Sequence, residues 1–208
     1  DAVKKIRNLI RIKKVGHAGT LDPLATGLLI ICTGKFTKRI NEFMAQEKEY
    51  TGTMVLGACT PSYDLETEVN ETFDISQLDE QQIRDTTRLF TGDLDQFPPA
   101  HSAIKVDGER LYMKARRGET VELKTRKVNI SHFEITRLEL PEIDFRVVCS
   151  KGTYIRSLVY DFGRSLDSGA YLSSLRRTKS GNYAADEAYG VIELVNHIKQ
   201  LKEQEKLK

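Results

Sequence analysis

The chain has 208 residues, of which 39% are hydrophobic and 30% are charged, a composition typical of one large globular domain or two small ones. No apolar run approaches the ~20 residues that span a bilayer, and the N-terminus has no signal-peptide pattern, so we expect a cytoplasmic protein. The three cysteines (Cys32, Cys59 and Cys149) are widely spaced and form no Cys-x-x-Cys pair, which argues against a disulfide framework and a zinc knuckle.

The formal net charge is only +2, but basic and acidic residues are concentrated in different segments of the chain. Residues 1–48 carry +6 and residues 57–96 carry −8, whereas residues 105–137 and 150–183 carry +4 each. If the basic blocks fold onto one face, they form a surface for a polyanion, with the acidic stretch on the far side. Ordinary solvated faces would explain the same charges, so charge alone leaves both interpretations open.

Hydrophobic periodicity predicts helices and strands that alternate along the chain. In the first half of the chain we expect a helix over 1–12, a shaped loop over 15–27, a buried strand over 28–33, a helix over 36–44, a strand over 49–56 and a helix over 79–90 with Asp79 as its N-cap. In the second half we expect a projecting hairpin and helix over 96–118, strands over 128–140 and 143–149, and helices over 154–166 and 191–201. Strands interleaved with helices, without repeats, indicate a single mixed α+β domain over residues 1–208.

Common catalytic templates are absent from the sequence. There is no phosphate-binding loop, no dinucleotide fingerprint and no His-Glu-x-x-His motif. The four histidines (His17, His101, His132 and His197) are scattered singly, so no metal site is predicted.

Two segments could carry chemistry. The first is KKVGHAGTLDPLATGLL at residues 13–29, where glycines bracket His17 and Asp22. Asp22 could equally be a turn residue before Pro23. The second is CSKGTYIRS at residues 149–157, which places Tyr154 and Arg156 at a helix start, where an arginine can hold a carboxylate or simply lie on the surface.

Five ordered blocks resemble the tRNA pseudouridine synthase B (TruB) family: KKVGHAGTLDPLATGLL, Lys48-Glu49-Tyr50, FPPAHSAIKVDGERLYMKARRG at 97–118, SKGTYIRSLVYDFG at 150–163 and LSSLRRTKSG at 172–181. The resemblance implies a pseudouridine synthase fold, with a mixed, largely antiparallel sheet flanked by helices and an RNA-clamping insertion near residues 97–127. It also implies isomerisation of uridine 55 in the T loop of tRNA, without a metal or an organic cofactor.

The resemblance also assigns roles to residues. Asp22 is the expected catalytic aspartate, as a nucleophile or as a base that removes the 2′ proton. Arg156 would pair with it, Tyr154 would line the pocket, and Tyr50 would stack on the base and could take its C5 proton. The expected substrate-binding residues are His17, which fills the space left by the flipped base, Leu175, which packs on the uracil, and Lys151, Lys105, Arg110, Lys114, Arg116 and Arg117, which bind RNA.

Three features depart from the family pattern. The family's N-terminal block with its Lys-Pro pair is expected ahead of Asp1 and is absent. After Tyr189 only a helix and a Lys/Glu tail follow, so we expect no C-terminal RNA-binding module. His101 replaces a usual aromatic residue, and Met113-Lys114 replaces an aromatic and acidic pair.

Other functions remain open as alternatives. The main one is a tRNA-binding folding chaperone in which isomerisation is secondary or lost. A relative that depends on a guide RNA is disfavoured by the insertion at 97–127, and no obligate protein partner is implied. A nucleoside hydrolase that uses Asp22 would not need a basic clamp.

Overall fold

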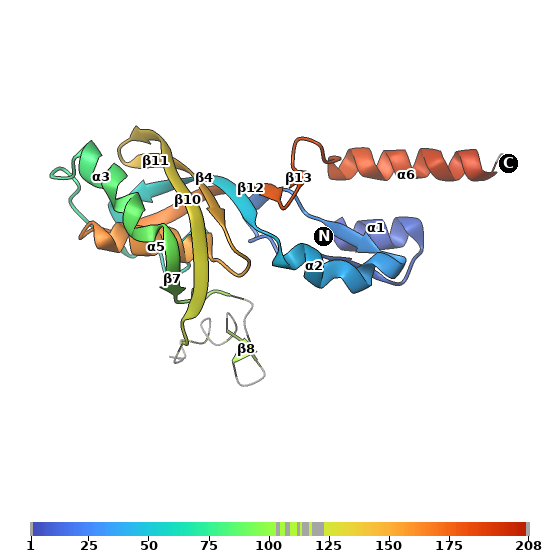
Figure 1. The fold of residues 1–208 in the computed structure, drawn as a ribbon, viewed down its shortest axis with the longest axis horizontal. Helices are drawn as coiled ribbons and strands as arrows, with labels where there is room; N and C mark the ends of the chain where they lie inside the picture. Colours follow the sequence, from blue (N-terminus) through green and yellow to red (C-terminus); the bar gives the residue numbers. More distant parts are fainter. Residues whose placement is uncertain are drawn as a thin grey trace.

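A twisted central sheet organises the molecule (Figure 1). The computed structural model describes residues 2–102, 105–106, 109–111, 113, 117 and 123–206. Within this part of the chain the sheet has seven strands. In spatial order they are β13 (Tyr183–Ala184), β12 (Ala170–Ser180), β4 (Lys48–Leu56), β11 (Glu142–Cys149), β10 (Arg126–Glu139) and β7 (Gly92–Gln96), with β2 (Ala25–Gly27) also paired to β12. Only the β2–β12 pairing is parallel among these pairs, which confirms the predicted mixed, largely antiparallel sheet.

Strands β10 and β11 form as predicted because their side chains alternate between core and solvent. Ile143, Phe145, Val147 and Cys149 are buried, whereas the residues between them are partly exposed. The two strands pair antiparallel through the turn at Pro141, and β11 then pairs with β4. This alternation turns one face of the sheet towards the helices.

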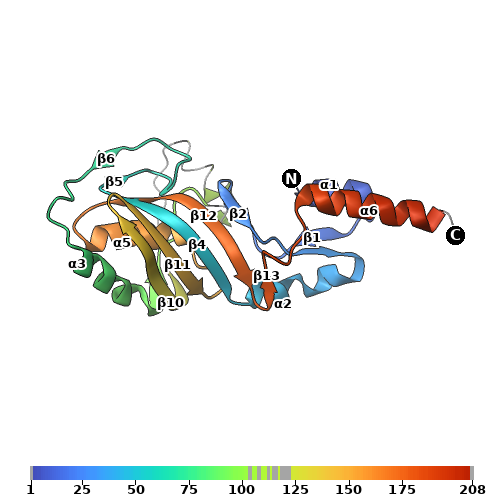
Figure 2. The ribbon, with the colours of Figure 1, turned by 90° about the horizontal axis from the view of Figure 1, so that it is seen from above.

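Helices α3 (Glu80–Thr86) and α5 (Ile155–Ser165) and the 3-10 helix η2 (Thr87–Phe90) pack against the sheet (Figure 2). Asp79 caps α3 as predicted, because its Oδ1 accepts a hydrogen bond of 2.8 Å from the Gln82 amide. Gly163 lets α5 approach the start of β12, since a Cβ at that position would lie 2.3 Å from the Ala170 nitrogen.

Phe162 on α5 lies at the centre of this core. Its side chain is fully buried, and its ring centroid is 5.6 Å from that of Phe133 and 6.0 Å from that of Phe90. We expect Phe162→Ala to lower the free energy of unfolding by about 3–5 kcal/mol, because it removes apolar contacts and leaves a cavity. Urea denaturation measures the loss. Phe36→Ala is the control, because Phe36 is 56% exposed, and a Phe162 effect as small as the control's would contradict this description of the core.

A second group of helices lies at the opposite end of the molecule from α3 (Figures 1 and 2). They are α1 (Ala2–Ile10), the 3-10 helix η1 (Gly34–Arg39), α2 (Ile40–Ala45) and α6 (Val191–Lys206), with the two-stranded sheet of β1 (Val15–His17) and β3 (Ile31–Thr33) between them. Helix α6 packs against α1, and the Lys202 ammonium donates a hydrogen bond to the Leu9 carbonyl. The other two-stranded sheets pair β5 (Ala58–Cys59) with β6 (Glu71–Thr72) and β8 (Lys105–Val106) with β9 (Glu109–Arg110).

Several element predictions were wrong in detail. The predicted loop 15–27 contains β1 and β2, and the predicted strand 28–33 begins only at Ile31, because the Leu28 amide bonds to the Arg177 carbonyl instead of a β1 residue. The helix expected over 36–44 is divided into η1 and α2. Strands β7 and β12 were not predicted at all.

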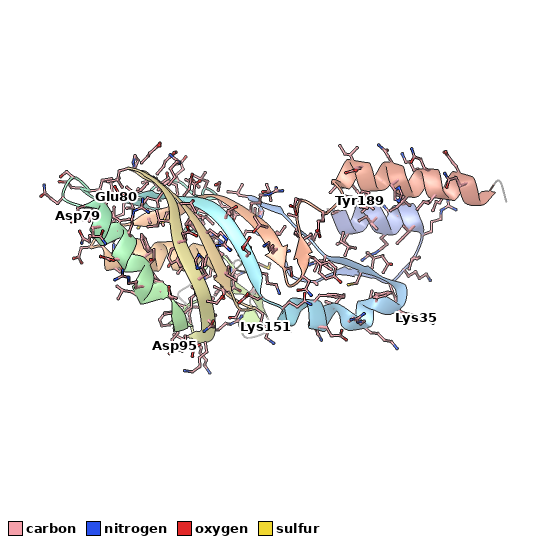
Figure 3. The ribbon with its side chains drawn as sticks, turned by 45° about the horizontal axis from the view of Figure 1, so that its top comes forward. Lys35, Asp79, Glu80, Asp95, Lys151 and Tyr189 are labelled. Atoms are coloured by element: carbon pink, nitrogen blue, oxygen red, sulfur yellow. The ribbon has the colours of Figure 1, made fainter. Side chains whose placement is uncertain are left out.

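The acidic stretch and the basic blocks are only partly separated. Asp79 and Glu80, from the acidic stretch, lie at one end of the molecule and Lys35 at the other, but Asp95, from the same stretch, lies on the same side as Lys151 (Figure 3). Asp95 also lies opposite Lys127 in the register of β7 and β10. The interpretation that separates the acidic stretch from the basic blocks therefore holds for Asp79 and Glu80 but not for Asp95.

Candidate active site

A cavity of about 800 Å³ opens beside the sheet. Its walls come from residues 19–22, α2, the first residues of β4 and β10, the segment 150–156 and β12. Six of the predicted site residues line it: Asp22, Tyr50, Lys151, Tyr154, Arg156 and Leu175. Segments that are far apart in the sequence therefore bring half of the predicted site residues together, including all four expected catalytic ones.

Asp22 and Arg156 form a two-point ion pair at the cavity wall. The distance from Arg156 Nη2 to Asp22 Oδ1 is 2.9 Å, and that from Nε to Oδ2 is 3.1 Å. Arg156 is only 3% exposed, whereas 29% of the Asp22 side chain is exposed. The predicted pairing is thus present. Both carboxylate oxygens are held, and the carboxylate remains accessible to a ligand in the cavity.

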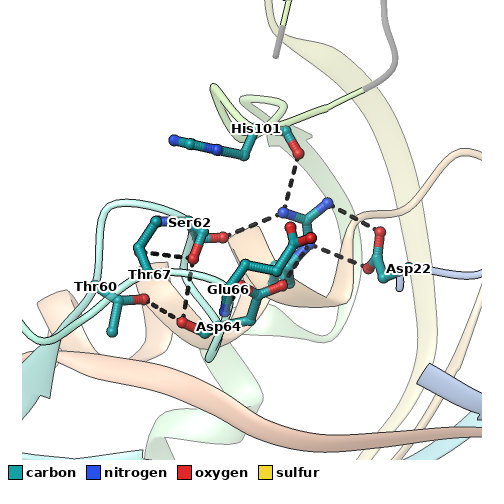
Figure 4. A network of polar contacts seen from close by, with 8 residues as sticks. Asp22, Thr60, Ser62, Asp64, Glu66, Thr67 and His101 are labelled. Carbon is teal, nitrogen blue, oxygen red and sulfur yellow. Dashed lines mark hydrogen bonds and ion pairs between the residues drawn. The ribbon is translucent and has the colours of Figure 1, made fainter. Parts of the chain in front are cut away.

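The rest of the Arg156 guanidinium is also fully engaged (Figure 4). Its Nη1 donates to the carbonyl oxygens of Ser62, at 3.2 Å, and His101, at 3.1 Å. Its Nε lies 3.6 Å from Oδ2 of Asp64, a carboxylate that is only 4% exposed. Arg156 therefore has one fixed orientation, which fixes Asp22 in turn.

Asp64 was not predicted as a site residue. It belongs to the acidic stretch 57–96, and the expectation that this whole stretch lies away from the site is wrong at this residue. The loop that carries it is tied by local hydrogen bonds, since the Asp64 carbonyl accepts from the hydroxyls of Thr60, at 2.7 Å, and Ser62, at 3.1 Å. The Asp64 carboxylate also accepts a hydrogen bond of 3.0 Å from the Glu66 amide.

Two tyrosines line the same cavity. Tyr50 is the third residue of β4, and Tyr154 is the N-cap residue of α5. Gln96 fixes the Tyr154 backbone, because its amide side chain bonds to both the Tyr154 N–H, at 2.8 Å, and its carbonyl, at 3.0 Å. Burial raises the pKa of both phenols above the ordinary value, so both remain protonated at neutral pH.

Four further basic residues line the cavity together with Lys151. Arg126, Lys127 and Lys151 are exposed at its edge, whereas Lys48 is 6% exposed and Arg177 is 2% exposed. The Lys48 ammonium donates to the carbonyls of Phe43, Met44 and Gln46, at the end of α2. Burial lowers the pKa of Lys48, and the charge of Arg177 lowers it further. Lys48 and Arg177 lie inside the quoted sequence blocks, but no periodicity indicated that these charged residues would be buried.

Other predicted binding residues lie outside this cavity or outside the described residues. His17 lies on β1 and does not line the cavity, and its buried Nδ1 has no hydrogen-bond partner among the described residues. Lys114 and Arg116 lie outside the described residues, as do the side chains of Lys105 and Arg110. Arg117 is described and pairs with Glu109 at 2.7 Å and 2.8 Å. The clamp therefore stays a prediction.

No group of three or more His, Cys, Asp or Glu side chains in the described part of the chain is arranged to hold a metal ion. No helix there is long and apolar enough to cross a membrane.

The chain is similar to known proteins along most of its length. The family model described as TruB family pseudouridylate synthase (N terminal domain) matches residues 7–155. A tRNA pseudouridine synthase B of Flavobacterium johnsoniae is 58% identical over 198 residues, which cover 92% of this chain and 86% of that protein. One of Bacteroides fragilis is 51% identical over 181 residues, which cover 87% of this chain and 78% of that protein.

Solved structures agree with these sequence matches. A chain in the crystal structure of a Cbf5-Nop10-Gar1 complex is 30% identical, with a TM-score of 0.74, and one in an H/ACA RNP bound to a substrate RNA containing 2′-deoxyuridine is 27% identical, with a TM-score of 0.71. Each match covers 97% of this chain, which spans about half the length of those chains (51% and 50%). The sequence blocks, the sheet and the family model lead to one conclusion: the chain belongs to the TruB family of pseudouridylate synthases.

Proposed function

We propose that this protein isomerises uridine 55 in the T loop of tRNA to pseudouridine, as one catalytic domain over residues 1–208. The observation that carries the proposal is Asp22, which Arg156 holds at two points on the wall of a cavity lined by Tyr50 and Tyr154. The names of the relatives that are 46–58% identical, all tRNA pseudouridine synthase B, support tRNA as the substrate.

The reaction needs no oxidant and no added group. The N1–C1′ glycosidic bond breaks, the uracil turns, and a C5–C1′ bond forms. The proton on C5 is then lost, and N1 gains one, so atoms and electrons balance within the nucleotide. A carboxylate beside the ribose is sufficient to begin this chemistry, either by attack on C1′ or by removal of the 2′ proton.

Each site residue has a distinct role. Arg156 holds Asp22 in one orientation at the cavity wall, and Leu175 offers an apolar surface to the uracil. Tyr50 stacks on the flipped base, a role that requires no charge. Because the Tyr50 phenol is protonated at neutral pH, it accepts the C5 proton only after it has given up its own.

A uridine inside a folded loop must leave its stack before it reaches this cavity. We propose that His17 fills the space that the base leaves. The insertion at 97–127 binds the RNA backbone through Lys105, Arg110, Lys114, Arg116 and Arg117. Lys151 binds the backbone as well, from the edge of the cavity.

We further propose that the protein acts on tRNA without a guide RNA, in the cytoplasm where tRNA is processed. The relatives named as tRNA enzymes are 46–58% identical, whereas the chains from the H/ACA and Cbf5 complexes are 26–30% identical and about twice as long. The likeness to the tRNA enzymes is therefore the greater one.

The salt dependence of tRNA binding measures the contribution of Lys151. If Lys151 contacts a phosphate, Lys151→Gln should weaken tRNA binding and reduce the slope of log K against log salt concentration by about one. Arg88→Gln is the control, because Arg88 is 81% exposed and lies on η2, away from the cavity. An equal slope for Lys151→Gln and the native chain would remove Lys151 from the RNA interface.

Release of tritium from tRNA transcripts that carry 5-tritiated uridine tests the proposed function, because C5 loses its hydrogen when it bonds to C1′. We expect the native chain to release one equivalent of tritium more from the native transcript than from a transcript with cytidine at position 55. Equal release from both transcripts, or none from either, would contradict the proposal.

A further inference from the structure

Arg177 is a buried arginine beside the segment that carries Asp22. It is 2% exposed and lies on β12. Its Nε donates a hydrogen bond of 2.8 Å to the Leu28 carbonyl, and its Nη2 donates one of 3.2 Å to the Gly19 carbonyl. These two carbonyls flank the segment 20–27, so one guanidinium holds both ends of the loop that contains Asp22.

The Arg177 backbone holds the same loop. The Leu28 amide donates a hydrogen bond of 2.8 Å to the Arg177 carbonyl, and β2 pairs with β12 in parallel with Gly27 opposite Arg177. Gly27 has a φ of +96°, and a Cβ there would lie 2.2 Å from the Arg177 carbonyl oxygen. Only glycine permits this close approach. Side chain and backbone together therefore attach the loop to the central sheet.

The buried charge of Arg177 is unusual. Its guanidinium donates to two carbonyl oxygens, and its charge also acts on the Tyr50 phenol. A buried guanidinium is costly to desolvate, so it is tolerated here only because these polar groups surround it. The same contacts link it to the loop of Asp22 and to a tyrosine of the cavity.

The neighbouring arginine has a different environment. Arg176 is exposed and lines a separate cavity of about 420 Å³ with Thr51 and Asp144. Arg177 instead lines the cavity of Asp22 and lies opposite Tyr50 in the register of β12 and β4. The two arginines therefore provide a matched pair on one strand.

We propose that Arg177 is a positioning residue for the isomerisation, which fixes the loop 19–28 so that Asp22 meets both Arg156 and the reacting ribose. This inference rests on the proposed function. Arg177 reaches the Leu28 carbonyl with Nε and the Gly19 carbonyl with Nη2, whereas a lysine at this position would have to reach both carbonyls from a single nitrogen. Displacement of a reacting group by about 1 Å can lower a rate on the order of 10²-fold.

Arg177→Lys, compared with Arg176→Lys, tests the inference. We expect the single-turnover rate of Arg177→Lys, at saturating enzyme, to fall by on the order of tenfold to a hundredfold, while its tRNA Kd stays near the native value. Arg176→Lys should keep the native rate. A double variant, Arg156→Lys with Arg177→Lys, should be slower than the native chain by much less than the product of the two single losses, because both residues act through Asp22.

A native rate in Arg177→Lys, an equal loss in Arg176→Lys, or fully multiplicative losses in the double variant would overturn the inference. If Arg177→Lys fails to fold, Gly19→Ala tests the same contact from the other side. Gly19 has a φ of +104°, which L side chains rarely adopt, so alanine there strains the backbone that presents the Gly19 carbonyl, while its Cβ would lie 3.4 Å from Arg177 Nη1, an ordinary contact distance. A native rate in Gly19→Ala would also overturn it. Failure of the native chain itself to convert uridine 55 would instead count against the proposed function.

Discussion

Asp22→Asn is expected to lower the rate of pseudouridine formation by on the order of 10³-fold or more, because the amide can neither attack C1′ nor remove a proton. Binding of tRNA should remain close to native, since the amide keeps the shape of the carboxylate. The fold should also survive. Arg156 keeps the Asp64 carboxylate 3.6 Å away and the carbonyls of Ser62 and His101. Single-turnover kinetics and a tRNA binding isotherm measure the two quantities separately.

Asp144→Asn is the matched control for this variant. Asp144 also pairs with an arginine, since Arg137 Nε lies 2.7 Å from its Oδ2, but it lies on β11 and does not line the Asp22 cavity. It should convert uridine at the native rate. Appreciable turnover by Asp22→Asn, or an equal loss in Asp144→Asn, would remove Asp22 from the chemistry.

The second large loss of rate is expected when Arg156 is replaced. Arg156→Lys keeps a positive charge beside Asp22 and Asp64, but an ammonium cannot hold both Asp22 oxygens and two carbonyls together. We expect the single-turnover rate to fall on the order of 10²-fold with tRNA binding nearly unchanged, because Asp22 loses its orientation rather than its charge.

Arg164→Lys provides the comparison for Arg156→Lys. Arg164 lies on the same helix, is 47% exposed and faces Glu71 at 3.8 Å. It should have the native rate and a similar thermal midpoint. A near-native rate in Arg156→Lys would show that the two-point pairing with Asp22 is not needed.

The elements that could be predicted from the sequence are those with a regular pattern. Strand β11 alternates without interruption, and α5 presents one apolar face, so both were predicted within one or two residues. Strand β12 was missed although it is central, because register shifts between Leu172 and Ser174 and between Arg177 and Lys179 interrupt the alternation. Its buried residues include Arg177 and Ser180, which no hydrophobicity pattern marks as core.

The site was predicted mainly through the family resemblance. Spacing alone left Asp22 as a turn residue and Arg156 as a surface residue, and their 134-residue separation carries no local signal. Asp64 was missed because it lies in a stretch whose net charge argued for distance from RNA. Lys48 and Arg177 were missed because their burial depends on carbonyl acceptors that only the folded chain brings together.

The most direct test of the account maps pseudouridine at single-nucleotide resolution in an unmodified tRNA transcript, after incubation with the native chain and, in parallel, with Asp22→Asn. We expect conversion at uridine 55 alone by the native chain, and none by the variant. Conversion at other uridines, conversion by the variant, or tRNA binding by the native chain without any conversion would contradict it.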